Sequence, residues 1–163
     1  MSVRAVLALG GNLGDRKKNI KSAIRALKSI EGIVVIAKSP LVESHALTEG
    51  GVDETKPNYL NGVIEIETTL KPGELLDAVH QIERDNGRIR LERWGSRTLD
   101  IDIITYGNLI KAGKRLELPH PRAFQRSFVV VPWALMNPSA ILPGHGKVAD
   151  LAEPLKHEVW ISA

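Results

Sequence analysis

The chain has 163 residues and a mass of 17.9 kDa, and its hydrophobic content of 43% and mean hydropathy of -0.09 fit one compact domain over residues 1–163 rather than two. It contains no cysteine, which excludes a disulfide framework, a thiolate zinc site and a thiol nucleophile. The net charge of +3 and the pI of about 9.3 permit a nucleic-acid partner, but they are equally expected of an enzyme that handles polyanionic nucleotides.

The first predicted element is a buried strand. Apolar residues alternate over residues 3–9, and Gly10-Gly11 ends the segment. A charged helical pattern follows the glycines, so this segment is not the apolar part of a signal peptide. No other apolar run approaches the roughly 18 residues that a membrane-spanning helix needs. We therefore expect a soluble, cytoplasmic protein with no membrane partner.

A helix is predicted next. Asp15 is a good N-cap residue, and Gly32 is the glycine expected just beyond the helix end. Residues 33–37 and 59–68 have the patterns of strands. Between them, residues 40–57 combine prolines, glycines and charges, and we predict a long exposed loop.

Residues 72–106 again have the pattern of a helix followed by a strand. Pro72 begins a predicted helix, Gly87 lies beyond its end, and residues 98–106 predict another strand. The order β-α-β-β-α-β is typical of a ferredoxin-like α+β fold, in which helices pack on the faces of an antiparallel sheet. The expected C-terminal additions are a hairpin at residues 107–108, a turn at residues 119–121, a mixed segment at residues 128–136 and a helix at residues 148–155.

Two aspartates in the last of these strands give the strongest chemical signal. In a strand, Asp100 and Asp102 project from one face while the apolar residues beside them point into the core. Their Cβ atoms then lie about 6 to 7 Å apart. Both carboxylates can reach one or two hard cations at that spacing, and magnesium is the natural candidate. The alternative is a surface ion network with neighbouring arginines.

A run of arginines without a lysine precedes the aspartates. Its members are Arg84, Arg88, Arg90, Arg93 and Arg97. A guanidinium group binds two phosphate oxygens at once, whereas lysine offers a point charge, so this cluster beside metal-type carboxylates indicates a polyphosphate ligand. Gly87 and Gly95 bracket most of the cluster and suit a loop that closes over phosphates and excludes water. The alternative is a solvated basic loop.

Three more polar or aromatic residues have patterns that suit ligand contacts. Glu83 falls on the apolar face of its helix, where a charge needs a partner: either a ribose hydroxyl or a buried arginine. Tyr59 and Asn61 share one face of a strand, where the ring can stack on a heterocycle and the amide can read a purine- or pterin-like edge. Packing and turn roles are the alternative for this pair.

The stretch Gly10-Gly11-Asn12-Leu13-Gly14-Asp15 is not a known phosphate-binding motif. It lacks the Gly-Lys-Ser/Thr ending of a P-loop and the spacing of a dinucleotide fingerprint. It predicts a tight turn followed by a helix cap.

Together, these residues resemble the 6-hydroxymethyl-7,8-dihydropterin pyrophosphokinase family of the folate pathway over nearly the whole chain. The segments that carry the resemblance are residues 9–15, 57–61, 93–102 and 118–122. The segment 93–102, Arg-Trp-Gly-Ser-Arg-Thr-Leu-Asp-Ile-Asp, is highly specific, whereas the glycine stretch alone is not.

The resemblance implies transfer of a diphosphoryl group from ATP to the pterin, with two Mg²⁺ ions and with ATP as co-substrate. We expect in-line attack by the pterin hydroxymethyl oxygen on the β-phosphorus, which releases AMP, in a monomer without a nucleic-acid partner. The implied site residues are Asp100 and Asp102 for the metals; Arg88 and Arg97 for catalysis at the phosphates; Glu83, Arg90, Arg93, Trp94, Arg97, His120 and Arg126 for ATP; and Ser44, Tyr59, Asn61 and Phe128 for the pterin.

Two positions depart from the family pattern. Ser96 stands where proline is common, and Ser44-His45 replaces a usual threonine-proline. Two rival functions are an RNA-binding module and a magnesium-dependent nucleotide hydrolase. The aromatic content of 4% and the lack of an RNP1-like run count against the first, and an assay with ATP alone tests the second.

Overall fold

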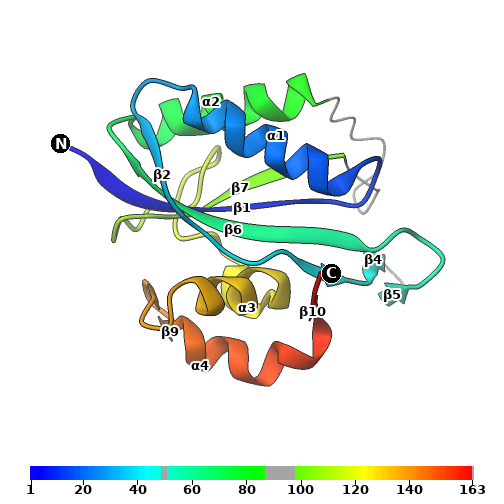
Figure 1. Cartoon of the computed structure of the whole chain (residues 1–163). Coiled ribbons are helices and arrows are strands. Elements are labelled where there is room, and N and C mark those ends of the chain that lie inside the picture. The colour runs from blue at the N-terminus through cyan, green and yellow to red at the C-terminus, as the bar shows by residue number, and fades with distance from the viewer. Residues whose placement is uncertain (49–50, 87–97, 163) are drawn as a thin grey trace.

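Helices cover both faces of an antiparallel β-sheet in the computed structural model, which describes residues 1–48, 51–86 and 98–162 (Figure 1). Over these residues the α-helices are α1 (Arg16–Lys28), α2 (Pro72–Asp85), α3 (Ser127–Met136) and α4 (Val148–Ala152). The strands are β1 (Val3–Gly11), β2 (Ile33–Lys38), β3 (Val42–Ser44), β4 (Ala46–Thr48), β5 (Gly51–Asp53), β6 (Tyr59–Thr68), β7 (Asp100–Tyr106), β8 (Ile141–Leu142), β9 (Gly146–Lys147) and β10 (Trp160–Ile161). Short 3-10 helices cover η1 (Ala123–Gln125) and η2 (Glu153–Glu158).

The main sheet follows the order β10-β3-β6-β1-β7, and β2 pairs with another part of β6. The pairs of β1 with β6, β1 with β7, and β2 with β6 are all antiparallel. Leu7 of β1 lies opposite Ile64 of β6 and Ile103 of β7 at the centre of this sheet. The mixed α/β architecture with an antiparallel sheet, predicted from the order of the elements, is therefore confirmed.

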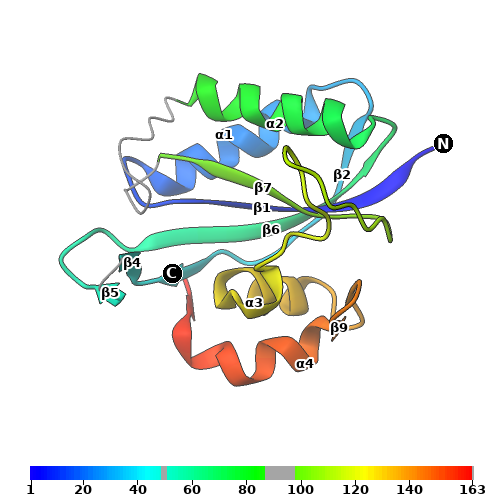
Figure 2. The same ribbon diagram turned by 180° about the vertical axis from the view of Figure 1, so that it is seen from behind.

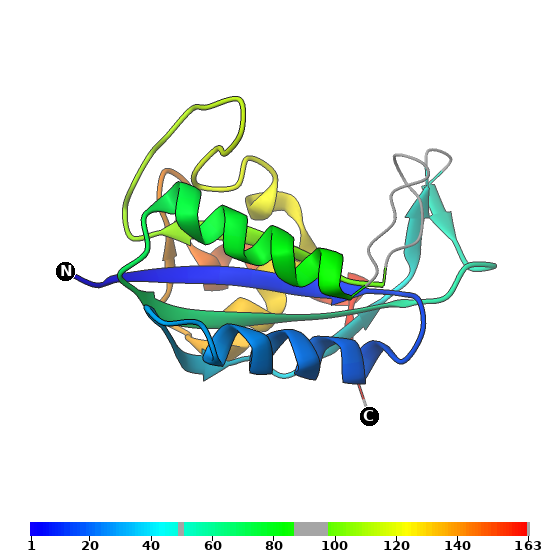
Figure 3. The ribbon, with the colours of Figure 1, turned by 90° about the horizontal axis from the view of Figure 1, so that it is seen from above.

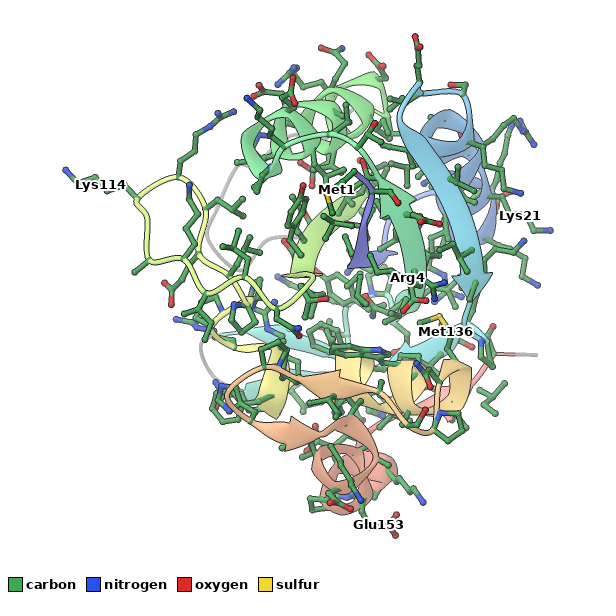
Figure 4. All side chains as sticks on the ribbon, turned by 90° about the vertical axis from the view of Figure 1, so that its left-hand side faces the viewer. Met1, Arg4, Lys21, Lys114, Met136 and Glu153 are labelled. Atoms are coloured by element: carbon green, nitrogen blue, oxygen red, sulfur yellow. The ribbon has the colours of Figure 1, made fainter. Side chains whose placement is uncertain are left out.

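Two hydrophobic cores lie on opposite faces of the sheet because successive side chains of a strand alternate. Leu7 and Ile101 belong to the core under α1 and α2, which lie side by side over the sheet in Figure 3. Val63 and Ile104 belong to the other core, with α3 and α4 (Figure 2). The end-on view in Figure 4 shows the three layers, with Lys114 far out on the segment that follows β7.

Residues 40–57, predicted to be a long exposed loop, contain three short strands. β3 pairs with both β6 and β10, and β4 pairs with β5. Val42, Ser44 and Ala46 are buried. The prediction was wrong because β3 is stabilised by pairing with distant segments, which the local composition does not reveal, and because β4 and β5 form a short pair with each other.

The glycines at the end of β1 also differ from the prediction. Gly10 and Gly11 are not in a turn but pair with β6 inside β1. The turn comes at Gly14, whose φ is 69°. Asp15 then caps α1 as predicted, since its carboxylate accepts the N–H of Lys18 at 3.1 Å.

Gly32 is not the residue that follows the helix end. The C-cap of α1 is Ser29, and Gly32 lies further on, with a φ of 93°, in the turn that leads to β2. A Cβ on Gly32 would lie 2.9 Å from the Thr69 hydroxyl oxygen, so both the backbone conformation and the close approach require glycine there.

The C-terminal additions are more helical than predicted. Residues 128–136, expected to be mixed, belong to α3, which contains Pro132 and is buried on nearly all sides between the sheet and α4. Burial of a helix that is apolar all round overrides the local signal of the proline. The predicted helix at residues 148–155 ends earlier, at Ala152, and continues as η2. Within the described ranges, no helix is long and apolar enough to cross a membrane.

Candidate active site

The polar residues of the site lie on the face of the sheet that is turned toward α3. Ile101 and Ile103 of β7 are buried in the core under α1 and α2, so Asp100 and Asp102 project from the opposite face. Ile104, on the same face as the aspartates, packs in the core with α3. The predicted alternation of core residues and carboxylates along this strand is therefore confirmed.

The strand register places Asn61 near these carboxylates. Gly10 of β1 lies between Asn61 of β6 on one side and Asp100 of β7 on the other. Asn61 has a relative exposure of 8%, and it shares its face with Tyr59, two residues earlier in β6. Tyr59 in turn lies opposite Ser44 of β3. Residues from four strands thus converge on one end of the sheet face.

Arg126 connects the carboxylates to the start of α3. Its guanidinium Nη1 lies 3.7 Å from Asp102 Oδ2, and its central carbon lies 5.6 Å from the centre of the Phe128 ring. Burial lowers the pKa of Arg126, while the charge of Asp102 acts in the opposite direction. Arg126 thus brings a cation to Asp102 while lying over an aromatic ring.

His120 is held on the same side by its own backbone. Its N–H donates to the carbonyl of Ile104, two residues after Asp102, at 2.8 Å. The N–H of Arg122 donates to His120 Nδ1 at 3.2 Å, so in the neutral ring the proton lies on Nε2. Burial lowers the pKa of His120 below 6.5, and the charge of Asp102 only partly offsets this effect. In its neutral form His120 therefore carries its donor at Nε2, and its ring is close enough to Asp102 for that charge to act on its pKa.

Glu83 acts on β7 from the opposite layer. Its side chain projects from α2, the residue has a relative exposure of 3%, and Oε2 accepts the backbone N–H of Ile101 at 2.8 Å. Ile101 lies between the two aspartates in the chain. The sequence placed Glu83 on the apolar face of its helix, and this position is confirmed. Its backbone partner was not foreseen because it lies on another element.

The sequence prediction missed two residues that hold the segment before Tyr59. Asn12 donates through Nδ2 to the carbonyl of Pro57 at 3.1 Å. Arg16 donates through Nη1 to the carbonyl of Asn58 at 2.8 Å and to Glu43 Oε1 at 2.9 Å. Asn12 lies within the glycine stretch and Arg16 directly follows it, and that stretch predicted only local turn chemistry. The only sequence signal for a long-range contact is that Asn12 and residues 57–61 both belong to segments that carry the family resemblance.

The remaining predicted residues divide into two groups. Phe128 is half-buried at the start of α3, on the same side of the sheet as Tyr59 and Asn61. Arg84, the first arginine of the predicted cluster, lies exposed on α2 and donates to Gln81 Oε1 at 2.8 Å. The predicted residues that lie outside the described ranges are Arg88, Arg90, Arg93, Trp94 and Arg97, together with Ser96.

The donor set suits magnesium. Among the residues that the structure describes, no group of three or more His, Asp or Glu side chains is placed to hold a metal. Magnesium does not need such a group, because it commonly binds through one or two carboxylates together with substrate phosphates and water. Asp100 and Asp102 supply two hard oxygen ligands on one face, and 44% of the Asp102 side chain is accessible. The residues present therefore fit Mg²⁺ that arrives with a phosphate ligand.

Comparison with known proteins gives one consistent family. The model of the family described as 7,8-dihydro-6-hydroxymethylpterin-pyrophosphokinase (HPPK) matches residues 6–138. The 2-amino-4-hydroxy-6-hydroxymethyldihydropteridine pyrophosphokinase of Haemophilus influenzae is 37% identical over 151 residues, which are 93% of this chain and 92% of the relative. The protein of the same name from Synechocystis is 41% identical over 143 residues, 88% of this chain and 71% of the relative.

Solved structures agree on the fold. The crystal structure of wild-type Plasmodium falciparum HPPK-DHPS with pterin and p-hydroxybenzoate superposes with a TM-score of 0.71 at 13% sequence identity, over 99% of this chain and 45% of that one. The same protein with pteroate gives a TM-score of 0.70 over 95% and 42% of the two chains. The present chain thus spans less than half of the length of these structures.

Proposed function

The chain belongs to the 7,8-dihydro-6-hydroxymethylpterin-pyrophosphokinase family, and from this premise we propose how its residues carry out the family reaction. The reaction is the transfer of a diphosphoryl group from ATP to hydroxymethyldihydropterin in folate synthesis. The pterin hydroxymethyl oxygen attacks the β-phosphorus of ATP in line with the departing α-phosphate oxygen. A new oxygen–phosphorus bond replaces the α–β bridge, and AMP leaves.

Asp100 and Asp102 would hold Mg²⁺, in the family pattern two ions, which would bind the ATP phosphates. Their common face on β7 and the accessible Asp102 side chain support this assignment. Bound magnesium would neutralise the charge that builds up on the phosphate oxygens. The protein contributes by keeping both carboxylates on a strand that is anchored at Ile101 by Glu83.

His120 and Arg126 bind the ATP phosphates beside the aspartates. A neutral imidazole with its proton on Nε2 donates a hydrogen bond to a phosphate oxygen, and the bond from Arg122 to Nδ1 favours that form. Arg126 supplies a guanidinium that can leave Asp102, at 3.7 Å, for a phosphate. Arg88 and Arg97 act on the phosphates during transfer, while Arg90, Arg93 and Trp94 complete the ATP site.

The pterin lies between the rings of Tyr59 and Phe128. Asn61 reads its edge, because an amide offers both a donor and an acceptor, and Ser44 lies opposite Tyr59 at the rim. This arrangement would put the pterin on the same sheet face as Asp100, two strands away, with β1 between them. Glu83 binds the ribose in addition to its bond with Ile101.

The finer assignments of the whole protein are also part of the proposal. The order β7-β1-β6-β2, with α1 and α2 as its crossovers, supports a ferredoxin-like arrangement with C-terminal additions. We assign residues 1–163 to one domain, to a monomer and to the cytoplasm, with no membrane or nucleic-acid partner.

The observation that carries the mechanism is the convergence of Asp100 and Asp102 with His120, Arg126 and Asn61 on one sheet face. The test measures AMP in reactions with ATP, Mg²⁺ and 6-hydroxymethyl-7,8-dihydropterin, and with each component left out in turn. AMP should form only in the complete mixture. AMP from ATP and Mg²⁺ without pterin would instead identify a nucleotide hydrolase.

A further inference from the structure

Gly10 occupies a special position in the site although its backbone does not require glycine. It pairs with Asn61 on one side and with Asp100 on the other, so it lies between the proposed pterin-reading amide and the proposed metal ligand. Its φ is outside the left-handed region that favours glycine, unlike that of Gly14. The reason for a glycine at this position must therefore be space and not backbone conformation.

The Asn61 side chain fills that space. A Cβ built on Gly10 would lie 1.8 Å from Asn61 Oδ1 and 2.8 Å from Asn61 Cγ, far inside van der Waals contact. The amide of Asn61 therefore reaches from β6 across β1, over the Cα of Gly10, in the direction of β7. At a relative exposure of 8%, Asn61 has little freedom to lie elsewhere while the surrounding side chains keep their places.

We infer that Gly10 is a positioning residue for substrate recognition. Because Gly10 has no side chain, the Asn61 amide can pack directly over its Cα. The inference depends on the proposed role of Asn61 in pterin binding. A methyl group at position 10 would push the amide off β1 and into the space above the sheet, because the backbone carbonyl of Leu60, 3.1 Å from the Cβ position, blocks retreat of the methyl group. Asp100 and Asp102 would keep their strand positions.

A side chain at position 10 should impair binding of the pterin but not binding of the nucleotide. Gly10→Ala should weaken binding of 6-hydroxymethyl-7,8-dihydropterin by about 10-fold or more, as expected for contacting residues that are strongly coupled. Pterin binding is measured by calorimetry in the presence of Mg²⁺ and a non-hydrolysable ATP analogue. Affinity for the analogue alone should change by less than about 2-fold, since the phosphate-binding residues are untouched. Equal losses for both ligands would indicate a general structural defect and would overturn the inference.

The double variant with Asn61 makes the test specific. In an Asn61→Ala background the clash partner is gone, so adding Gly10→Ala should change pterin affinity by less than about 2-fold. A full 10-fold additional loss in that background would exclude Asn61 as the group that Gly10 accommodates. Gly73→Ala is the matched control, because a Cβ on Gly73 in α2 meets no atom within 4 Å, and it should leave both affinities unchanged.

If Gly10→Ala does not fold, the Gly10→Ala/Asn61→Gly variant decides: recovered folding supports the inference, and failure to fold overturns it. AMP formation by the wild-type protein shows whether a failure concerns the proposed function or only the role of Gly10. A wild type that makes no AMP from ATP and pterin contradicts the proposed function. A wild type that makes AMP beside a Gly10→Ala variant with normal pterin affinity contradicts only the role of Gly10.

Discussion

The two faces of the sheet are formed by the same strands, but one face is an apolar core and the other carries the polar residues of the candidate site. Toward α1 and α2, residues such as Leu7, Ile66 and Ile101 form a continuous apolar core. Toward α3, the same strands place Asn61 and Asp100 at one end of the sheet and apolar residues further along. Because side chains alternate with a period of two, a substitution on one face of the sheet leaves the side-chain packing on the other face unchanged. Stability and activity should therefore respond to different substitutions.

Asp102→Ala should give the largest effect, a loss of turnover of about 10³-fold or more, since a metal ligand that stabilises phosphate charge contributes several kcal/mol. The melting temperature should stay near that of the wild type, because 44% of this side chain is accessible. AMP production and thermal melting are measured on the same preparation. Asp150→Ala, an exposed aspartate on α4, is the matched control. Near-normal AMP production by Asp102→Ala would refute the metal assignment.

Leu7→Ala should produce the reverse pattern. Leu7 is completely buried against Ile64 and Ile103, so the substitution should lower the free energy of unfolding by about 2–5 kcal/mol. Urea unfolding measures this loss, and the KM for the pterin should be unchanged in the protein that remains folded. Val34→Ala on the exposed part of β2 is the control, with an expected change within about 0.5 kcal/mol. A raised KM for Leu7→Ala would mean that the two faces are not independent.

Glu83 links α2 to the strand that carries the two aspartates, and its variants sharpen the comparison. Glu83→Ala leaves the buried N–H of Ile101 without its acceptor, which should cost about 1–3 kcal/mol of unfolding free energy. Glu83→Gln keeps an acceptor oxygen and should cost less. The affinity of the Glu83→Gln variant for ATP tests the proposed contact with the ribose. A normal affinity would contradict that contact and leave only the structural contact with β7.

His120 should give the smallest effect, visible as a pH dependence. Burial depresses its pKa, with Asp102 and Glu117 acting to raise it and Arg126 and Arg122 acting to lower it. The unfolded chain therefore takes up a proton at this position more readily than the folded chain. The stabilising contribution is full above pH 6.5 and is lost as the pH falls through the lower, folded-state pKa.

The His120→Gln variant isolates this contribution. Melting temperatures of the wild type and the variant are compared between pH 7.5 and pH 5.5, and the wild type should lose more stability over that range. A larger loss in the variant would reverse the sign of the assigned pKa shift.

The sequence predicted the structure best where a feature depends only on residues that are close together in the chain. The alternation of Asp100 and Asp102 with Ile101 and Ile103 needs only the period of a strand, and it predicted both the core face and the site face. The cap at Asp15 is similarly local. In both cases the interacting groups lie within a few residues of one another.

The failures have a common physical cause. β3 forms within residues 40–57 because β6 and β10 pair with it, α3 tolerates Pro132 because it is buried, and Gly10 stays in a strand because β6 and β7 pair with it on both sides. In each case a distant segment decides the conformation, and local propensity points elsewhere. The partners of Arg16 and Glu83 are also on other elements, so spacing along the chain could not reveal them.

The pairing of β10 has a practical consequence for anyone who attaches a label or an affinity handle to this protein. Trp160 and Ile161 pair with β3, whose last residue, Ser44, lies opposite Tyr59 at the proposed pterin site. A group fused beyond Ile161 could therefore disturb the pairing of β10 with β3 at the rim of the candidate site. Met1 precedes Val3, the first residue of β1, which lies about 23 Å along the strand from Gly10. A handle on the amino end should leave ligand binding undisturbed.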